Sequence, residues 1–285
     1  MFKVIAVEPA AVANSYRDFK YITEKFGIHE GRLIAAFPKK WKKLVYREAQ
    51  VRLKGMLDLS RLEDRLRRLK DDVLYRSSRP GEGCEINWLE AAIAEHDREP
   101  FDAIIASTPS KVQIVVAADD LDADHACLHP NRQWHIKREA EAMARCCVPL
   151  LSGGRHIKLI DPHFDLGQTR FRRPFAAMLK YVLPGTTVDV YRGDGQGIDF
   201  IAQRFANALS EARPEGVRIR LFLLPQETLH NRFLLTEIGG LYFLTGLDDQ
   251  GNGELNTDEV GVLEPAVWAV QWGKFCGDCP VGIWA

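Results

Sequence analysis

Long apolar segments and a secretion signal are both missing from this chain. No apolar run approaches the roughly 18 residues that a membrane-spanning helix needs, and the N-terminus lacks the pattern of a signal peptide. These absences predict a cytoplasmic protein without a membrane partner. Net charge is nearly absent as well, because 38 Lys and Arg residues stand against 39 Asp and Glu residues and leave a formal net charge of −1. The overall charge therefore indicates no partner, and only local runs of charge are informative.

Cysteine is scarce, with six residues in a chain of 285, which is too few for a disulfide-built scaffold. Without secretion, free thiols are expected. Cys276 and Cys279 have the C-x-x-C spacing of half a zinc site, but no second cysteine pair stands at a fitting distance. The segment 124–129, with two histidines and one cysteine, is an alternative source of ligands. We favour unpaired thiols, and we expect neither a metal nor another cofactor.

Two segments are candidates for binding phosphate. Residues 39–70 contain 12 Lys and Arg residues and 4 Asp and Glu residues, with Trp41 among the first lysines. This pattern is typical either of nucleic-acid contact or of an ordinary solvated helix face. The glycine-rich segment 193–197 precedes a helical pattern but lacks the Lys-Ser/Thr pair of a P-loop, so a flexible connection is the better interpretation. By contrast, residues 237–264 include seven acidic residues and no basic ones.

The hydrophobic content of 46% and charged content of 27% are those of a folded globular protein. Periodicity predicts strands at 2–7, 32–37, 101–106, 112–117, 157–160, 187–191, 217–224, 232–235 and 241–244. It predicts helices at 17–26, 39–56, 59–75, 87–97, 133–151, 171–182 and 199–213, and a loop at 77–83. We therefore expect an α/β protein. A smaller α/β domain of unknown role at 1–132 would precede a mixed sheet flanked by helices at 133–285.

The segment from His230 to Glu237 carries the most specific chemistry. His230 and Arg232 are two residues apart in a segment with strand character, so both side chains are expected on one face. An imidazole can attack phosphorus, and a guanidinium can bind phosphate oxygens in a bidentate manner. Glu237 lies beyond the apolar run and is a candidate to orient the site. This set suits phosphodiester cleavage that needs no metal.

The same segment resembles the phospholipase D superfamily, whose motif is His-x-Lys-x-x-x-x-Asp followed by a small-residue turn. Here the motif reads His230-x-Arg232-x-x-x-x-Glu237, and Thr245 to Asp248 fall where the turn is expected. The strand that ends in Asp161-Pro162-His163 resembles the start of many phospholipase D-like domains. The resemblance covers about residues 150–270 and implies a nucleophilic histidine that forms a phosphohistidine.

The superfamily builds one active site from two motifs, whereas this chain contains one. The resemblance therefore implies a homodimer in which each protomer supplies one histidine. His163, at a strand end, is the local alternative for the general acid. The resemblance also makes Asp161, Asn231, Thr245, Asp248 and Arg173 candidates for substrate binding. The plainer interpretation treats Asp161 as a turn-capping residue, Thr245 and Asp248 as parts of a tight turn, and Arg173 as a solvated cation.

The function implied is a phosphodiesterase, and more specifically a nuclease, because a basic run suits a polyanion and no membrane-docking segment is present. One alternative is a catalytically degenerate scaffold that binds nucleic acid or a protein partner in a larger assembly. A second alternative is a lipid hydrolase. Stand-alone proteins of this layout resemble components of bacterial mobile-element and phage-defence loci, and the first domain would then bind substrate or a protein partner.

Overall fold

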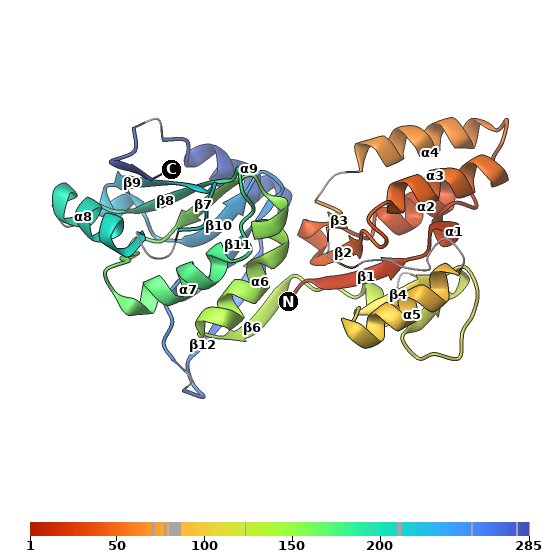
Figure 1. Cartoon of the computed structure of the whole chain (residues 1–285), viewed down its shortest axis with the longest axis horizontal. Helices are drawn as coiled ribbons and strands as arrows, with labels where there is room; N and C mark the ends of the chain where they lie inside the picture. The colour runs from red at the N-terminus through yellow and green to blue at the C-terminus, as the bar shows by residue number, and fades with distance from the viewer. Residues whose placement is uncertain are drawn as a thin grey trace. The chain divides into compact units, whose positions relative to one another are not determined.

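The computed structural model forms two compact units, Phe2–Asn131 and Arg132–Ala285, here called the N-terminal and C-terminal units (Figure 1). The sequence analysis places this boundary after residue 132. The residues described are 1–69, 72–76, 79, 87–122, 124–195, 197–209, 213–251, 253–277 and 279–284. The expected loop at 77–83 lies almost entirely outside them. Both units contain a sheet with helices on its faces, so the protein is an α/β protein, as predicted.

The described residues of the N-terminal unit form a 5-stranded parallel sheet in the order β3-β2-β1-β4-β5. Its strands are β1 Lys3–Val7, β2 Arg32–Ala35, β3 Leu74–Tyr75, β4 Ala103–Ala106 and β5 Val115–Ala117. Strands β2 and β4 are buried along their whole length, as parallel strands covered on both faces are. Strand order reverses beside β1, which makes this unit a doubly wound sheet.

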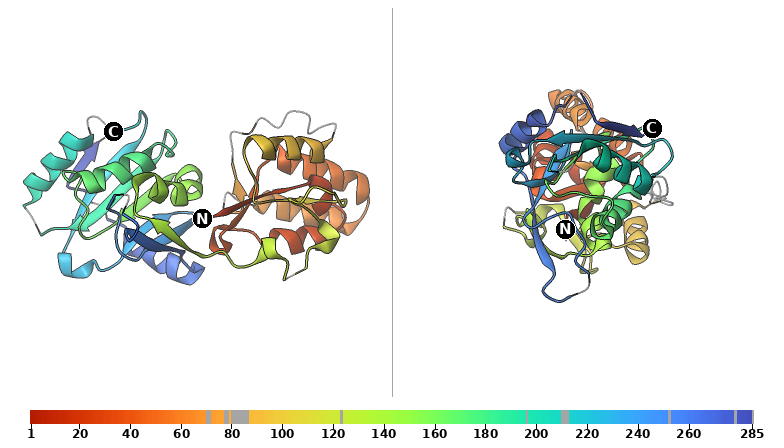
Figure 2. Two further views of the ribbon diagram at one scale, coloured as in Figure 1. Left: turned by 90° about the horizontal axis from the view of Figure 1, so that it is seen from below. Right: turned by 90° about the vertical axis from the view of Figure 1, so that its left-hand side faces the viewer.

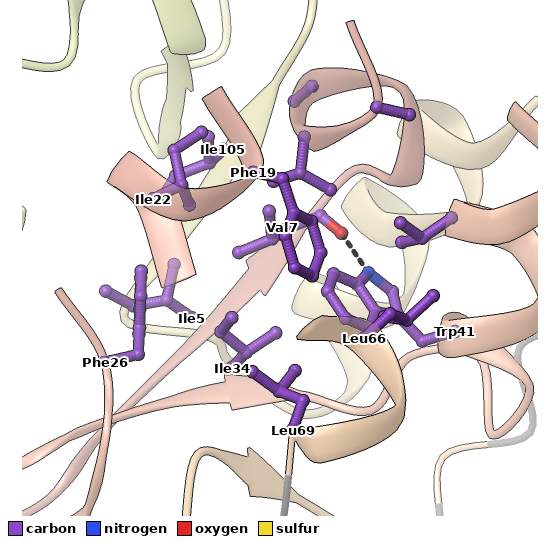
Figure 3. Packing of buried hydrophobic residues seen from close by; sticks show 14 of the residues in the cluster. Ile5, Val7, Phe19, Ile22, Phe26, Ile34, Trp41, Leu66, Leu69 and Ile105 are labelled. Carbon is purple, nitrogen blue, oxygen red and sulfur yellow. Dashed lines mark hydrogen bonds between the residues drawn. The ribbon is translucent and has the colours of Figure 1, made fainter. Parts of the chain in front are cut away.

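Helices cover both faces of that sheet (Figures 1 and 2). They are α1 Pro9–Val12, α2 Tyr16–Thr23, α3 Trp41–Arg52, α4 Leu57–Arg68 and α5 Trp88–Arg98. Side chains of α2, α3 and α4 pack with β1 and β2 in the larger apolar cluster, shown in Figure 3. Helix α5 packs on the opposite face through Trp88. Trp41 fixes the start of α3, because its Nε1 donates a hydrogen bond to Val7 O at 2.6 Å.

The described residues of the C-terminal unit form an 8-stranded mixed sheet in the order β13-β9-β8-β7-β10-β11-β12-β6. Its strands are β6 Gln133–Lys137, β7 His156–Ile160, β8 Thr187–Gly193, β9 Arg218–Leu224, β10 Arg232–Thr236, β11 Gly239–Phe243, β12 Thr257–Val262 and β13 Gly282–Trp284. Strands β7, β8 and β9 are parallel to one another, and β10 joins β7 in antiparallel register.

Four helices flank the described part of this sheet: α6 Ala140–Gly153, α7 Thr169–Leu179, α8 Ile198–Leu209 and α9 Pro265–Lys274. Helices α6, α7 and α8 lie on one face and α9 on the other (Figure 2). Two right-handed parallel crossovers in the same direction place α7 and α8 on the same face. On the other face, Trp268 and Trp272 of α9 pack against an apolar cluster of β7, β8, β9 and β10 side chains.

Two sequence expectations about the elements are wrong. Residues 133–137 are the strand β6 and not the start of a helix, because their side chains alternate between exposed and buried and pair with β12. The expected helix 59–75 ends at Arg68, and Leu74–Tyr75 instead forms β3 beside β2. The strands β12 and β13 and the helix α9 were not predicted.

Candidate functional site

Three charged side chains lie at the edge of the C-terminal sheet where β7 and β8 end and β10 begins. Asp161 directly follows β7. Arg192 is the second-to-last residue of β8, and Arg232 is the first residue of β10. Their neighbours along the strands pack in the apolar cluster under α9: Ile160, Tyr191 and Phe233. Because side chains alternate along a strand, the three charged groups point to the opposite face, which α7 and α8 cover. Ligands of open α/β sheets commonly bind outside the carboxyl ends of strands.

Asp161 is the buried centre of this edge, with 1% of its surface exposed. Its carboxylate accepts hydrogen bonds from the backbone N–H groups of His163 at 2.8 Å and Leu247 at 3.1 Å. Burial raises the pKa of Asp161, while these two hydrogen bonds and the nearby charges of Arg232 and His163 lower it by smaller amounts. Asp161 therefore ties the β7–α7 loop to the loop after β11 and supplies negative charge between cations.

Arg192 is a site residue that the sequence analysis missed. It is 6% exposed, and burial lowers its pKa, while the carboxylates of Asp165 and Asp161 raise it. Its Nε donates a hydrogen bond to the carbonyl oxygen of Gly193 at 3.1 Å. A lone arginine at the carboxyl end of a buried parallel strand was the available signal in the sequence.

His230 is exposed and lies two residues before β10. Because it is outside the strand, the alternation of strand side chains does not place it on the same face as Arg232. Its carbonyl oxygen accepts a hydrogen bond from Nη1 of Arg232 at 3.3 Å. In the described part of the chain, Nε of Arg232 is buried without a hydrogen-bond partner. An unsatisfied buried donor is costly, whereas the rest of the Arg232 side chain is only half-buried.

A second histidine lies at the same end of the sheet as His230, because β7 and β10 are antiparallel neighbours. Phe233 pairs with Ile160 at the last matched position of β10 and β7. The chain turns directly after β7, and His163 lies in that turn, where its backbone N–H donates to Asp161, while His230 lies two residues before β10. Both side chains are exposed, so both are accessible from solvent.

A second cluster of charges surrounds the loop after β11. Asp248 is 5% exposed and pairs with Arg138 and, at 3.4 Å, with Arg170. Asp249 pairs with Arg173 at 3.4 Å. The loop lies close to the first cluster, since a Cβ on Gly246 would be 2.8 Å from Oδ1 of Asp248 and 3.8 Å from Oδ2 of Asp161. Two of the five residues expected to bind substrate, Asp248 and Arg173, are therefore engaged in ion pairs that hold this loop.

The remaining candidates are Glu237, Asn231 and Thr245. The structure does not bring Glu237 to His230, because five strand residues at about 3.3 Å each separate Arg232 from Glu237 by about 16 Å. Glu237 instead accepts the N–H groups of Arg155 at 2.6 Å and His156 at 3.1 Å at the other edge of the sheet. Asn231 and Thr245 are exposed, and the N–H of Thr245 donates to Asp258 Oδ1 at 3.0 Å.

The zinc alternative finds no complete site. Within the described ranges, no group of three or more His, Cys, Asp and Glu side chains is arranged to hold a metal ion. The five cysteines at positions 127, 146, 147, 276 and 279 are free thiols. In the segment 124–129, Nδ1 of His125 contacts Sγ of Cys127 at 3.1 Å, and Nε2 of His129 contacts the carbonyl oxygen of Asp124 at 2.7 Å. None of the helices in the described part of the chain is long and apolar enough to cross a membrane.

Comparison with known proteins leaves the family open. No family model and no curated protein matches the chain. Among solved structures, the chain is similar to TrmBL2, an archaeal chromatin protein described as showing a novel mode of DNA binding, at 10% identity and a TM-score of 0.29 over 83% of this chain and 79% of that one. It is also similar to polyphosphate kinase from Porphyromonas gingivalis, at 14% identity and a TM-score of 0.33 over 82% of this chain and 41% of that one. The chain thus spans less than half of the kinase, and neither similarity carries an argument about fold or function.

Proposed function

We propose that the C-terminal unit is a phospholipase D-like nuclease that cleaves a phosphodiester without a metal through a phosphohistidine at His230. The observation that carries the proposal is that Arg232 and His163 lie close to the buried carboxylate of Asp161 where β7 ends and β10 begins, with His230 two residues before Arg232. Two histidines can supply a nucleophile and a general acid, and arginines can neutralise the phosphoryl oxygens. The set therefore offers a nucleophile, a general acid and cations for the phosphoryl oxygens.

The reaction would proceed in two displacements at phosphorus. An imidazole nitrogen of His230 attacks phosphorus, the bond to the leaving oxygen breaks, and His163 donates a proton to that oxygen. Water then attacks the phosphohistidine, His163 takes up a proton from this water, and the P–N bond breaks to regenerate His230. Arg232 and Arg192 would hold the phosphoryl oxygens in both steps. Asp161 would keep the two arginines and His163 in place.

Nucleic acid is the proposed substrate because cations and an exposed aromatic side chain lie along the helices that follow β7 and β8. A pocket of about 480 Å³ between α7 and α8 is lined by Arg172, Phe200 and Arg204. Phe200 is 52% exposed, and Arg204 lies over its ring at 5.2 Å. Aromatic faces stack on unpaired bases while arginines contact phosphates, which favours a single strand.

The proposal retains the homodimer as the alternative source of the general acid. In that arrangement His230 of one protomer attacks and His230 of its partner protonates the leaving oxygen. The two versions differ in their prediction for His163, which is dispensable only in the dimeric site. Activity of a strict monomer would assign the acid role to His163.

The second candidate function is a scaffold that binds nucleic acid or a protein partner without cleaving it. One observation favours it: in the described residues, no carboxylate contacts the imidazole of His230, whereas Glu237 lies at the far edge of the sheet. A nucleophilic histidine without such a partner has no fixed tautomer. Binding that is unaffected by His230→Ala, without cleavage by the wild type, would support this candidate.

The test is cleavage of labelled single- and double-stranded DNA and RNA in the presence of EDTA. We compare the wild type with His230→Ala and with His135→Ala, which replaces an exposed histidine of β6 in the same sheet. The proposal predicts cleavage that resists EDTA, persists in His135→Ala and is lost in His230→Ala. Equal cleavage by both variants would show that His230 is not the nucleophile.

A further inference from the structure

A basic pocket opens in the N-terminal unit at the carboxyl ends of β2 and β3. It has a volume of about 550 Å³ and is lined by Ala36, Lys39, Lys40, Trp41, Lys42, Lys43, Leu74 and Arg76. Ala36 directly follows β2, Leu74 belongs to β3, and Arg76 follows it. The described lining contains five cations and no acidic residue. This volume is within the range of small-molecule sites, roughly 300–1,000 Å³.

The chemistry of the pocket is divided between its apolar lining and its rim. The apolar lining is small: Ala36 is half-buried, Trp41 and Leu74 are buried, and Trp41 is held rigidly by its hydrogen bond to Val7. Lys39 and Lys43 at the rim are exposed. Considering only the described residues, neither of them makes an ion pair. A small apolar lining beside concentrated positive charge suits a ligand with one apolar part and one polyanionic part.

The placement of the lysines opposes local stability. Lys39 to Lys43 surround the first turn of α3, whose N-terminus carries the positive end of the helix dipole. Lys40 occupies the N-cap without a side-chain hydrogen bond, and the first turn has no acidic residue. Cations at this end are unfavourable, so an arrangement of several indicates a site that an anion completes.

The usual ligand crevice of a doubly wound sheet lies where strand order reverses, here between β1 and β4. That position is crossed by the carboxylate of Glu8, which accepts the backbone N–H of Ser107 at 2.6 Å and its Oγ–H at 2.7 Å. A carboxylate repels phosphate, so the reversal point does not suit an anion. The basic pocket lies along the same edge, at the carboxyl ends of β2 and β3, and its lining suits an anion.

We infer that the basic pocket binds a nucleoside polyphosphate, with the base on the apolar lining and the phosphates between Lys39, Lys40 and Lys43. The inference is independent of the proposed nuclease site, since every residue it uses belongs to the N-terminal unit. It gives that unit a function, the binding of a small nucleotide.

The test is isothermal titration of the full chain with ATP, adenosine, tripolyphosphate and a single-stranded oligonucleotide of about 12 nucleotides. Lys39→Ala/Lys43→Ala removes two positive charges from the rim. Arg47→Ala/Lys54→Ala removes two exposed positive charges from the same basic run without touching the pocket lining. Circular dichroism confirms that both variants fold.

We expect ATP to bind the wild type and the Arg47→Ala/Lys54→Ala variant alike, and the Lys39→Ala/Lys43→Ala variant at least about tenfold more weakly. Tripolyphosphate and adenosine should each bind more weakly than ATP. Three results would overturn the inference: an equal loss in both variants, tripolyphosphate binding as tight as ATP, or oligonucleotide binding that depends on Lys39 and Lys43 while ATP does not bind.

Discussion

Replacing Asp161 tests whether one buried carboxylate holds the candidate site together. Asp161→Ala leaves the N–H groups of His163 and Leu247 without their acceptor in a buried place. Each unsatisfied donor costs about 1–3 kcal/mol, and the relief of a buried charge offsets part of this, so we expect a loss of about 2–4 kcal/mol in the free energy of unfolding. Asp161→Asn keeps one acceptor oxygen and should lose about half as much. Urea unfolding followed by tryptophan fluorescence measures both.

The pH dependence of the free energy of unfolding, compared between the wild type and Asp161→Asn, gives a second, independent readout. Burial raises the pKa of Asp161 in the folded protein, so on raising the pH the unfolded chain loses this proton first. The contribution of Asp161 to stability is therefore complete below the ordinary carboxyl pKa and is lost as the pH rises through the raised value. Relative to Asp161→Asn, the wild type should become less stable across this window. A relative gain on raising the pH, or an unchanged stability in Asp161→Ala, would refute the reasoning.

Three further predictions concern single residues. Glu237→Ala should lower the free energy of unfolding by about 0.5–1.5 kcal/mol, because the solvent-exposed N–H groups of Arg155 and His156 exchange their acceptor for water, and it should leave the cleavage rate of the folded protein unchanged. Burial lowers the pKa of Lys158, so in urea unfolding the wild type should gain stability relative to Lys158→Met as the pH approaches the ordinary lysine value of 10.5. His163→Gln should slow oligonucleotide cleavage by about 10²–10⁴-fold in initial-rate assays, but should slow cleavage of bis(4-nitrophenyl) phosphate far less, because nitrophenolate leaves without a proton. Equal slowing of both substrates would argue against His163 as the general acid.

The alternation of apolar segments was enough to predict the α/β class and most of the elements from β7 to β11. Buried parallel strands such as β4 are continuous apolar runs, and helices such as α7 show their period in the sequence. Segment 133–137 was misread because its alternation is short and runs into the helical pattern of α6. What makes it a strand is its pairing with β12, a contact between residues more than a hundred positions apart.

The candidate site was predicted only in part, for a geometric reason. Spacing in the sequence indicated that His230 and Arg232 are close and singled out Asp161 and His163 separately, and the antiparallel pairing of β10 with β7 explains why Asp161 lies near Arg232. Spacing does not tell which edge of a sheet a residue reaches, so Glu237 was grouped with His230 although a whole strand separates them. Arg192 was not found, because the burial that distinguishes it from a surface arginine depends on the packed helices.

The central claim is that His230 forms a covalent bond to phosphorus. The most direct measurement is to trap the adduct. The protein is mixed in EDTA with an excess of an unmodified oligonucleotide and quenched with denaturant within the first turnover. The adduct is then mapped by mass spectrometry at alkaline pH. The account predicts a phosphoryl-linked fragment on His230 that is absent from His230→Ala and present in His135→Ala. Cleavage without any adduct on His230, at the same rate in His230→Ala, would contradict it.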